Sequence, residues 1–243
     1  MSEKEIRELT DRLIDLSFAE DIGDGDHTTL CCIPEDAMGR SRLLIKEEGI
    51  LAGVEVAKEV FRRFDPDMQV EVLMGDGTHV KPGDVAMIVT GRVRSLLQTE
   101  RLMLNIMQRM SGIATMTARY VKRLEGTGTR VLDTRKTTPG MRMLEKAAVK
   151  IGGGTNHRIG LFDMILLKDN HVDFAGGITN AIDRCHKYLE EKGKNLKIEI
   201  EVRNFDVMAG NDADNAKAAD VNGDGNVDVS DIGAVIDLMA GKQ

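Results

Sequence analysis

The sequence predicts an α/β protein, and two observations carry that prediction. Residues 2–124 combine amphipathic helical patterns with a strand–hairpin–strand pattern. From about residue 130 onward, short apolar runs alternate with helical patterns, which is typical of a parallel sheet or a (β/α) barrel. In such barrels the chemistry lies at the carboxyl ends of the strands.

The first part begins with a helix, because Ser2 is followed three residues later by Glu5, the spacing of a capping box. Its other elements follow from apolar periodicity and turn residues. In order, we expect a loop over Asp21–Thr29, a strand pair over Ser41–Gly53, a helix over Val54–Phe64, and strands at residues 69–74 and 85–91 joined by a hairpin.

A long helix is predicted over Leu96–Leu124. Its apolar stripe comprises Leu102, Ile106, Met110 and Ile113, and its methionines are typical of gap-filling core residues. The second part then alternates. We expect strands at 129–134, 164–170 and 197–202, with helices over Met141–Ile151, which three glycines end, and over Thr179–Lys192, which Gly193 ends.

Composition narrows the class of protein. The 243 residues are 42% apolar and 30% charged, an ordinary globular balance, and the net charge of −7 argues against nucleic acid as a partner. No apolar run approaches the ~18 residues of a membrane span. Three cysteines are too few for a disulfide framework, and the first residues are charged rather than leader-like. These features predict a cytoplasmic protein.

The acidic charge is concentrated in the last stretch of the chain. From Asp206 to Gln243 there are 8 Asp, 2 Lys and no aromatic residue, whereas the rest of the chain is nearly neutral. This shift predicts a boundary near Asp206.

Basic residues follow the predicted strands of the second part. Thr134, Arg135 and Lys136 follow the first strand, His157 and Arg158 follow the triple glycine, and Lys168 ends the next strand. If these strands are neighbours, the cations converge on one mouth, which Arg101 of the long helix could join. Such a pocket predicts a ligand with several negative charges, a dicarboxylate or a phosphate ester, because Arg matches both in bidentate geometry. The alternative is a set of unrelated surface charges.

The strand at 197–202 places Glu199 and Glu201 on one side. Among these cations, Glu201 could hold Mg²⁺ or a sugar hydroxyl, since Mg²⁺ sites in phosphate chemistry use one or two carboxylates. The alternative is a salt bridge to an arginine of the pocket.

Several strings together resemble quinolinate phosphoribosyltransferase, also called nicotinate-nucleotide pyrophosphorylase (carboxylating). They are EDIGDGDHTT, ERLMLN, MSGIAT, LDTRKTTPGMR, KIGGGTNHRIGL, LLKDNHV and IEIEV, and the match runs from about Leu9 to Phe205. The resemblance implies an N-terminal α/β sandwich followed by an incomplete (β/α) barrel, in a homodimer. It also implies conversion of quinolinate and phosphoribosyl pyrophosphate to nicotinate mononucleotide, pyrophosphate and CO₂ with Mg²⁺, a step of NAD biosynthesis.

The resemblance also implies roles for individual residues. Arg135, Lys136, His157, Arg158 and Lys168 would bind the quinolinate carboxylates and the phosphates, with Thr134 in the same loop. Arg101 would reach into the partner subunit's site, and Glu201 would face the ribose and Mg²⁺. Lys136 and Glu201 are the residues expected to be catalytic.

Beyond Phe205 the sequence departs from the family pattern, which continues with a metal- and ribose-binding Asp and two phosphate-holding turns. We therefore expect little turnover from this chain. The segment DVNGDGNVDVSD instead resembles one dockerin-type calcium-binding repeat. Its expected Ca²⁺ ligands are Asp220, Asn222, Asp224, Asn226, Asp228 and Asp231. The alternative is an Asx-rich turn before an acidic helix.

The predicted organisation is an α/β sandwich at 1–105, a partial (β/α) barrel at 106–205 and an acidic calcium-loop tail at 206–243. Two other functions stay open. One is a calcium-dependent interaction protein whose tail binds a cohesin-like partner on an inactive enzyme scaffold. The other is a paralogue that uses another phosphoribosyl acceptor, although the retained cations favour quinolinate.

Overall fold

The computed structural model describes residues 1–202 and divides into two compact units. Unit 1 comprises Met1–Glu125 and Arg130–His157, and unit 2 comprises Gly126–Thr129 and the chain from Arg158 onward. The calcium loop predicted after residue 206 lies outside the described residues. None of the helices within residues 1–202 has the length and apolarity to cross a membrane.

Unit 1 opens with two helices, α1 (Glu3–Ile22) and α2 (His27–Cys32). The predicted capping box is confirmed, because the Ser2 hydroxyl accepts from the Glu5 backbone amide while the Glu5 carboxylate accepts from the amide of Ser2. The loop predicted over Asp21–Thr29 is too long. Asp26 accepts from the amide of Thr29 at 3.0 Å and so caps α2, which leaves only Gly23–Asp26 between the helices.

An antiparallel sheet in the order β1-β5-β3 forms one layer of unit 1. Its strands are β1 (Met38–Leu44), β3 (Gln69–Val72) and β5 (Val85–Arg92). The strand pair predicted over Ser41–Gly53 is wrong in its pairing. β1 pairs with β5, while the short β2 (Gly49–Ile50) pairs with β4 (His79–Val80) in a separate ribbon.

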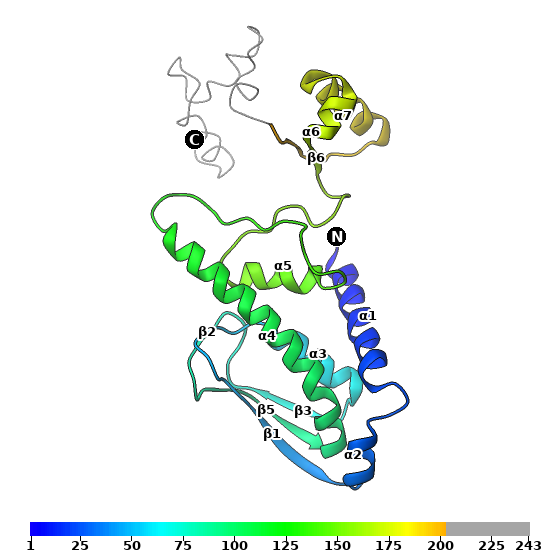
Figure 1. The fold of residues 1–243 in the computed structure, drawn as a ribbon, viewed down its shortest axis with the longest axis vertical. Coiled ribbons are helices and arrows are strands. Elements are labelled where there is room, and N and C mark those ends of the chain that lie inside the picture. Colours follow the sequence, from blue (N-terminus) through cyan, green and yellow to red (C-terminus); the bar gives the residue numbers. More distant parts are fainter. Residues whose placement is uncertain (203–243) are drawn as a thin grey trace. The chain divides into compact units, whose positions relative to one another are not determined.

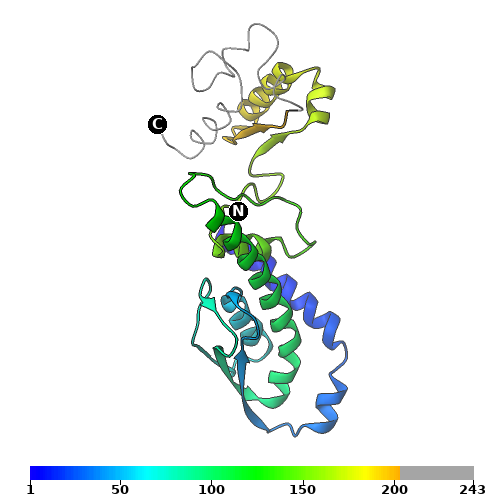
Figure 2. The ribbon, with the colours of Figure 1, turned by 60° about the vertical axis from the view of Figure 1, so that its left-hand side comes forward.

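Helices α3 (Val54–Phe64) and α4 (Val93–Arg123) form the other layer, and the predicted bounds of α3 are confirmed. In both views α4 lies between α1 and the sheet (Figures 1 and 2). Its predicted stripe is buried at Leu102, Ile106 and Met110, and together with α3 and β5 it forms one apolar core. Met103 and Met107 are buried as expected, whereas Met116 is half exposed.

Unit 1 ends with α5 (Arg142–Ile151), which packs on α4. The strand predicted at 129–134 is reduced to a single parallel bridge between Leu132 and Thr155. The glycines after α5 are needed for close packing as well as for ending the helix. A Cβ on Gly152 would lie 2.4 Å from the Ala114 carbonyl oxygen of α4.

Unit 2 contains a parallel pair of strands, β6 (Ile165–Leu167) and β7 (Ile198–Ile200). Two helices connect them, α6 (Asp169–Ala175) and α7 (Ile178–Lys192), and Gly193 ends α7 in the left-handed conformation as predicted. Helix α6 replaces the end of the strand expected at 164–170. The parallel strands and their helical connection confirm the predicted α/β class.

Candidate active site

The predicted substrate residues of unit 1 lie on two adjoining segments, 133–138 and 155–157. The parallel bridge joins them, with the Asp133 amide donating to the Thr155 carbonyl at 3.2 Å and the Thr155 amide donating to the Val131 carbonyl at 2.8 Å. Thr134, Arg135 and Lys136 therefore lie beside Asn156 and His157. This part of the predicted convergence occurs within one unit of the described chain.

Asp133, which is not among the predicted site residues, holds these segments together. Its carboxylate forms an ion pair with Lys146 of α5 and accepts from the Asn156 side-chain amide at 2.5 Å and from the His157 backbone amide at 2.9 Å. Both members of the ion pair are nearly inaccessible, at 7% and 4% side-chain exposure. Burial of charges is costly unless they are paired, so this contact fixes the two segments together.

Glu145, the residue before Lys146, holds the other end of the 133–138 loop. It accepts from the Thr138 amide at 3.1 Å and from Arg109 Nε of α4 at 2.9 Å. Burial alone would raise the pKa of Glu145, but the hydrogen bonds from Thr138 and Arg109 outweigh it and leave the pKa lowered. In the sequence, Glu145 and Lys146 stand out as a charged pair inside the apolar pattern of the predicted helix.

Between these ends, Arg135 has an unusual environment. Its Nε is buried and has no hydrogen-bond partner among the described residues, whereas buried donors are normally paired. Its neighbours Thr134 and Lys136 are exposed, and the Lys136 amide donates to the Thr134 hydroxyl at 3.0 Å. The loop thus presents one half-buried and one exposed cation.

In unit 2, Lys168 and Glu201 meet at the carboxyl ends of β6 and β7. The Glu201 amide donates to the Leu167 carbonyl at 2.8 Å, and the two side chains form an ion pair at 3.5 Å. Lys168 also precedes α6, where its amide donates to His171 Nδ1 at 3.0 Å. Glu201 is therefore paired with a predicted pocket cation, but the partner is Lys168 rather than the arginine that the alternative named.

Arg158 begins the main part of unit 2 and is 9% exposed. The turn that follows is held by Asp163, whose carboxylate accepts from the amides of Ile159 at 2.7 Å and Gly160 at 2.8 Å. Burial would raise the pKa of Asp163, but these amide hydrogen bonds outweigh it and lower the pKa. A charged Asp163 therefore fixes the backbone just after Arg158.

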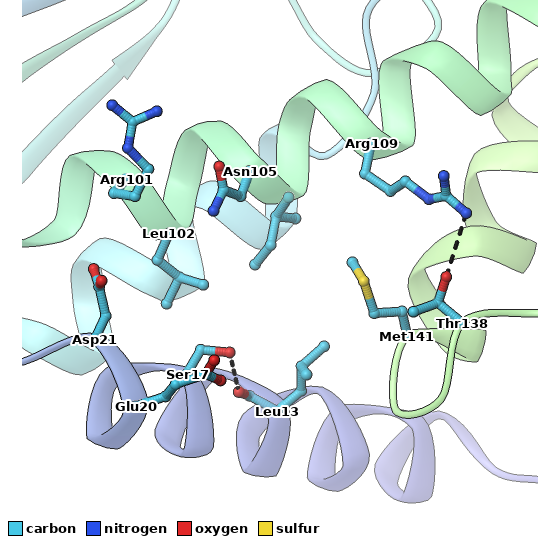
Figure 3. Close-up of a pocket in the computed structure, with 11 residues that line it drawn as sticks. Leu13, Ser17, Glu20, Asp21, Arg101, Leu102, Asn105, Arg109, Thr138 and Met141 are labelled. Carbon is cyan, nitrogen blue, oxygen red and sulfur yellow. Dashed lines mark hydrogen bonds between the residues drawn. The ribbon is translucent and has the colours of Figure 1, made fainter.

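Arg101 lies apart from the 133–138 loop, on the wall of a cavity of about 440 Å³ between α1 and α4. Figure 3 shows Arg101, Asn105 and Arg109 on α4, with Glu20 and Asp21 on α1 opposite. Arg109 also lines this cavity and donates to the Thr138 hydroxyl at 3.3 Å (Figure 3). The cavity therefore adjoins the 133–138 loop at its Thr138 end.

The predicted site residues therefore form two groups. Thr134, Arg135, Lys136 and His157 belong to unit 1, and Arg158, Lys168 and Glu201 belong to unit 2. Nowhere within residues 1–202 do three His, Cys, Asp or Glu side chains gather to hold a metal ion. In both groups, cations lie next to backbone segments that hydrogen bonds to carboxylates hold in place. This arrangement suits anionic ligands.

Two family models match the chain. The model for the quinolinate phosphoribosyl transferase N-terminal domain matches residues 26–111, and the model for the C-terminal domain matches residues 113–239. Their junction lies inside α4, as does the predicted boundary at 105/106. The C-terminal match also runs through the segment predicted to be a calcium loop, and that loop stays a prediction.

Curated proteins and solved structures give the same family. The chain is 44% identical to the chloroplastic nicotinate-nucleotide pyrophosphorylase [carboxylating] of Oryza sativa subsp. japonica, over 79% of this chain and 51% of the relative. It is 43% identical to a probable nicotinate-nucleotide pyrophosphorylase [carboxylating] of Synechocystis, over 78% and 63%. The structure of NadC from Streptococcus pyogenes superposes with a TM-score of 0.78 at 36% identity, over 90% of this chain and 74% of that one.

The chain therefore belongs to the quinolinate phosphoribosyl transferase family. The models of both family domains match the chain, and the sequence resemblance is confirmed. The chain spans about half the length of the first curated relatives that it matches.

Proposed function

We propose that the protein takes part in phosphoribosyl transfer from phosphoribosyl pyrophosphate to quinolinate, with decarboxylation to nicotinate mononucleotide. The observation that carries the proposal is the buried Nε of Arg135, which has no hydrogen-bond partner within residues 1–202, beside the exposed Lys136 and the adjoining His157. A dicarboxylate supplies the acceptors that such an unpaired donor needs, because a guanidinium binds a carboxylate in bidentate geometry. The relatives named nicotinate-nucleotide pyrophosphorylase [carboxylating] support quinolinate as the ligand.

In this proposal the residues act mainly by binding and orienting anions. Arg135, Lys136 and His157 hold the quinolinate carboxylates so that the pyridine nitrogen faces the ribose anomeric carbon. Arg158 and Lys168 hold phosphate groups. Positioning of this kind and electrostatic stabilisation supply most of the rate when charge moves between anionic groups.

The reaction balances without a redox partner. The ring nitrogen forms a bond to the anomeric carbon as the bond to pyrophosphate breaks, through a transition state like that of glycosyl transfer. The carboxylate at the neighbouring ring carbon then leaves as CO₂. The positively charged ring nitrogen stabilises the electron pair left on that carbon, which takes a proton to give nicotinate mononucleotide.

The described residues fit a Mg²⁺ ion that arrives with the substrate rather than one held by a protein cage. Mg²⁺ in phosphate chemistry is commonly bound by one or two carboxylates together with phosphate oxygens. Glu201 is one such carboxylate, next to Lys168. The ion would neutralise charge on the departing pyrophosphate, while Glu201 faces the ribose.

The test uses two acceptors. The chain is incubated with phosphoribosyl pyrophosphate, Mg²⁺ and either quinolinate or nicotinate, and nicotinate mononucleotide and CO₂ are measured alongside ligand binding by calorimetry. We expect quinolinate to bind, nicotinate to bind more weakly, and any product to form with equimolar CO₂ and to be lost in Lys136→Ala. Product from nicotinate, or no binding of quinolinate, would overturn the proposal.

A further inference from the structure

The loop that carries Thr134, Arg135 and Lys136 contains neither helix nor strand over residues 133–138. Apart from the bridge at its start, its shape depends on side-chain contacts. Several of these contacts come from the first two turns of α5, so that helix helps to determine where the loop's cations lie.

The contacts hold the loop at both ends. Glu145 and Lys146 are consecutive, oppositely charged and buried, at 5% and 3% exposure. Lys146 pairs with Asp133 at the start of the loop, and Glu145 accepts from the Thr138 amide at its end, at 3.1 Å. The two charges of one helix turn therefore hold the two ends of one loop.

The middle of the loop and the outer side of Glu145 are also held. Arg142 of α5 donates from Nε to the Thr137 hydroxyl at 3.1 Å and from Nη2 to the Arg135 carbonyl at 3.5 Å. Arg109 of α4 pairs with Glu145 at 2.8 Å. A buried charge that loses its partner is strongly unfavourable, so these charges hold the loop in one arrangement.

We propose that Glu145 and Lys146 are positioning residues for anion binding at the 133–138 loop. They hold the loop backbone so that Arg135 and Lys136 are in place before the ligand arrives, which removes the cost of ordering the loop on binding. This inference rests on the proposed function, because it takes quinolinate as the ligand. Neither residue is assigned contact with the substrate.

The alternative is that Glu145 and Lys146 contribute only to stability. Asp65 offers a matched control that separates the two possibilities. Asp65 is a buried carboxylate paired with Arg92 at 2.8 Å, just as Glu145 is paired with Arg109. Its other partners are the Ser95 hydroxyl in the first turn of α4 and the Asp67 amide, whereas the loop contacts α4 at Arg109, further along the helix. Asp65→Asn therefore makes the same chemical change as Glu145→Gln without touching the loop.

The experiment compares quinolinate binding and amide hydrogen exchange in the wild type, Glu145→Gln, Lys146→Met and Asp65→Asn. We expect quinolinate affinity to fall on the order of tenfold in the two α5 variants, which corresponds to the loss of about one hydrogen bond. Amides of residues 134–138 should exchange faster in these variants. In Asp65→Asn the affinity should stay within about twofold of the wild type, and exchange of the loop should not change.

Each outcome decides the question. Equal effects of Glu145→Gln and Asp65→Asn on affinity and on loop exchange would overturn the inference. If the wild type does not bind quinolinate, the proposed function fails, and loop exchange alone then decides whether α5 positions the loop. If Glu145→Gln does not fold, Arg109→Ala replaces it, because Arg109 is half exposed, and a loop that exchanges as in the wild type would again overturn the inference.

Discussion

Lys168 and Glu201 form an ion pair, with 3.5 Å between Lys168 Nζ and Glu201 Oε1. The two residues follow the carboxyl ends of the neighbouring parallel strands β6 and β7. Each side chain is about half exposed. The pair places an acidic group beside a cation that is proposed to bind phosphate. Glu201 therefore reduces the local positive charge when no ligand is bound.

This relationship predicts that Glu201→Gln has little effect on stability but strengthens the binding of pyrophosphate. Half-exposed ion pairs contribute little, so the free energy of unfolding should change by less than about 1 kcal/mol. Lys168 would lose its competing carboxylate, and pyrophosphate should bind a few-fold more tightly. Urea unfolding and calorimetry measure the two effects, and weaker binding of pyrophosphate would contradict the assignment of Lys168.

A second prediction concerns pH and Asp65. Hydrogen bonding from Arg92, opposed by burial and supported by Ser95, lowers the pKa of Asp65 from 3.8 to about 2. A lowered pKa in the folded state contributes stability that is complete above pH 4 and is lost as the pH falls toward 2. At about 1.4 kcal/mol per pH unit, the contribution at neutral pH is about 2 kcal/mol.

Asp65→Asn should therefore be less stable than the wild type by about that amount at pH 7, and the difference should shrink between pH 4 and pH 2. Urea unfolding at several pH values measures this. A difference that stays constant down to pH 2 would show that the carboxylate charge is not the cause.

Gly152 gives a third prediction. Its missing side chain allows close approach to the Ala114 carbonyl and to Thr117, and a Cβ there would meet backbone at 2.4 Å. Gly152→Ala should destabilise the protein by about 1–3 kcal/mol, as overpacking does. The same substitution at Gly112 of α4 is the control. Within residues 1–202, a Cβ at Gly112 would meet nothing within 4 Å outside the adjacent backbone of its own helix, so Gly112→Ala should be neutral or stabilising by up to about 1 kcal/mol.

The elements that could be predicted from the sequence are those that local signals define. Helix α3 has an amphipathic pattern and ends before Asp65-Pro66, so its bounds were predictable. The separation of β1 and β2 into different sheets was not, because strand pairing depends on residues distant in the chain. The candidate site likewise has one part that local sequence patterns indicate and another part that depends on contacts between distant residues.

The cations after the strands were visible as a pattern, and the bridge of Leu132 to Thr155 brings part of that pattern together. The charged pair Glu145 and Lys146 stands out within the apolar pattern of α5, but the sequence does not indicate that these residues hold the loop together with Asp133. Charged residues in a helix are ordinarily exposed, and the burial of Glu145 and Lys146 depends on the packing of α5 against other parts of unit 1.

The most direct test of the account is calorimetric titration of quinolinate into the wild type and into Arg135→Ala. In the proposed function, Arg135 binds a ligand carboxylate, and its buried Nε has no other partner in the described part of the chain. Loss of a desolvated charge pair costs on the order of 2–5 kcal/mol, so binding to Arg135→Ala should be undetectable, and binding to the wild type should weaken as salt is raised. Equal affinity of the two proteins for quinolinate would contradict the account.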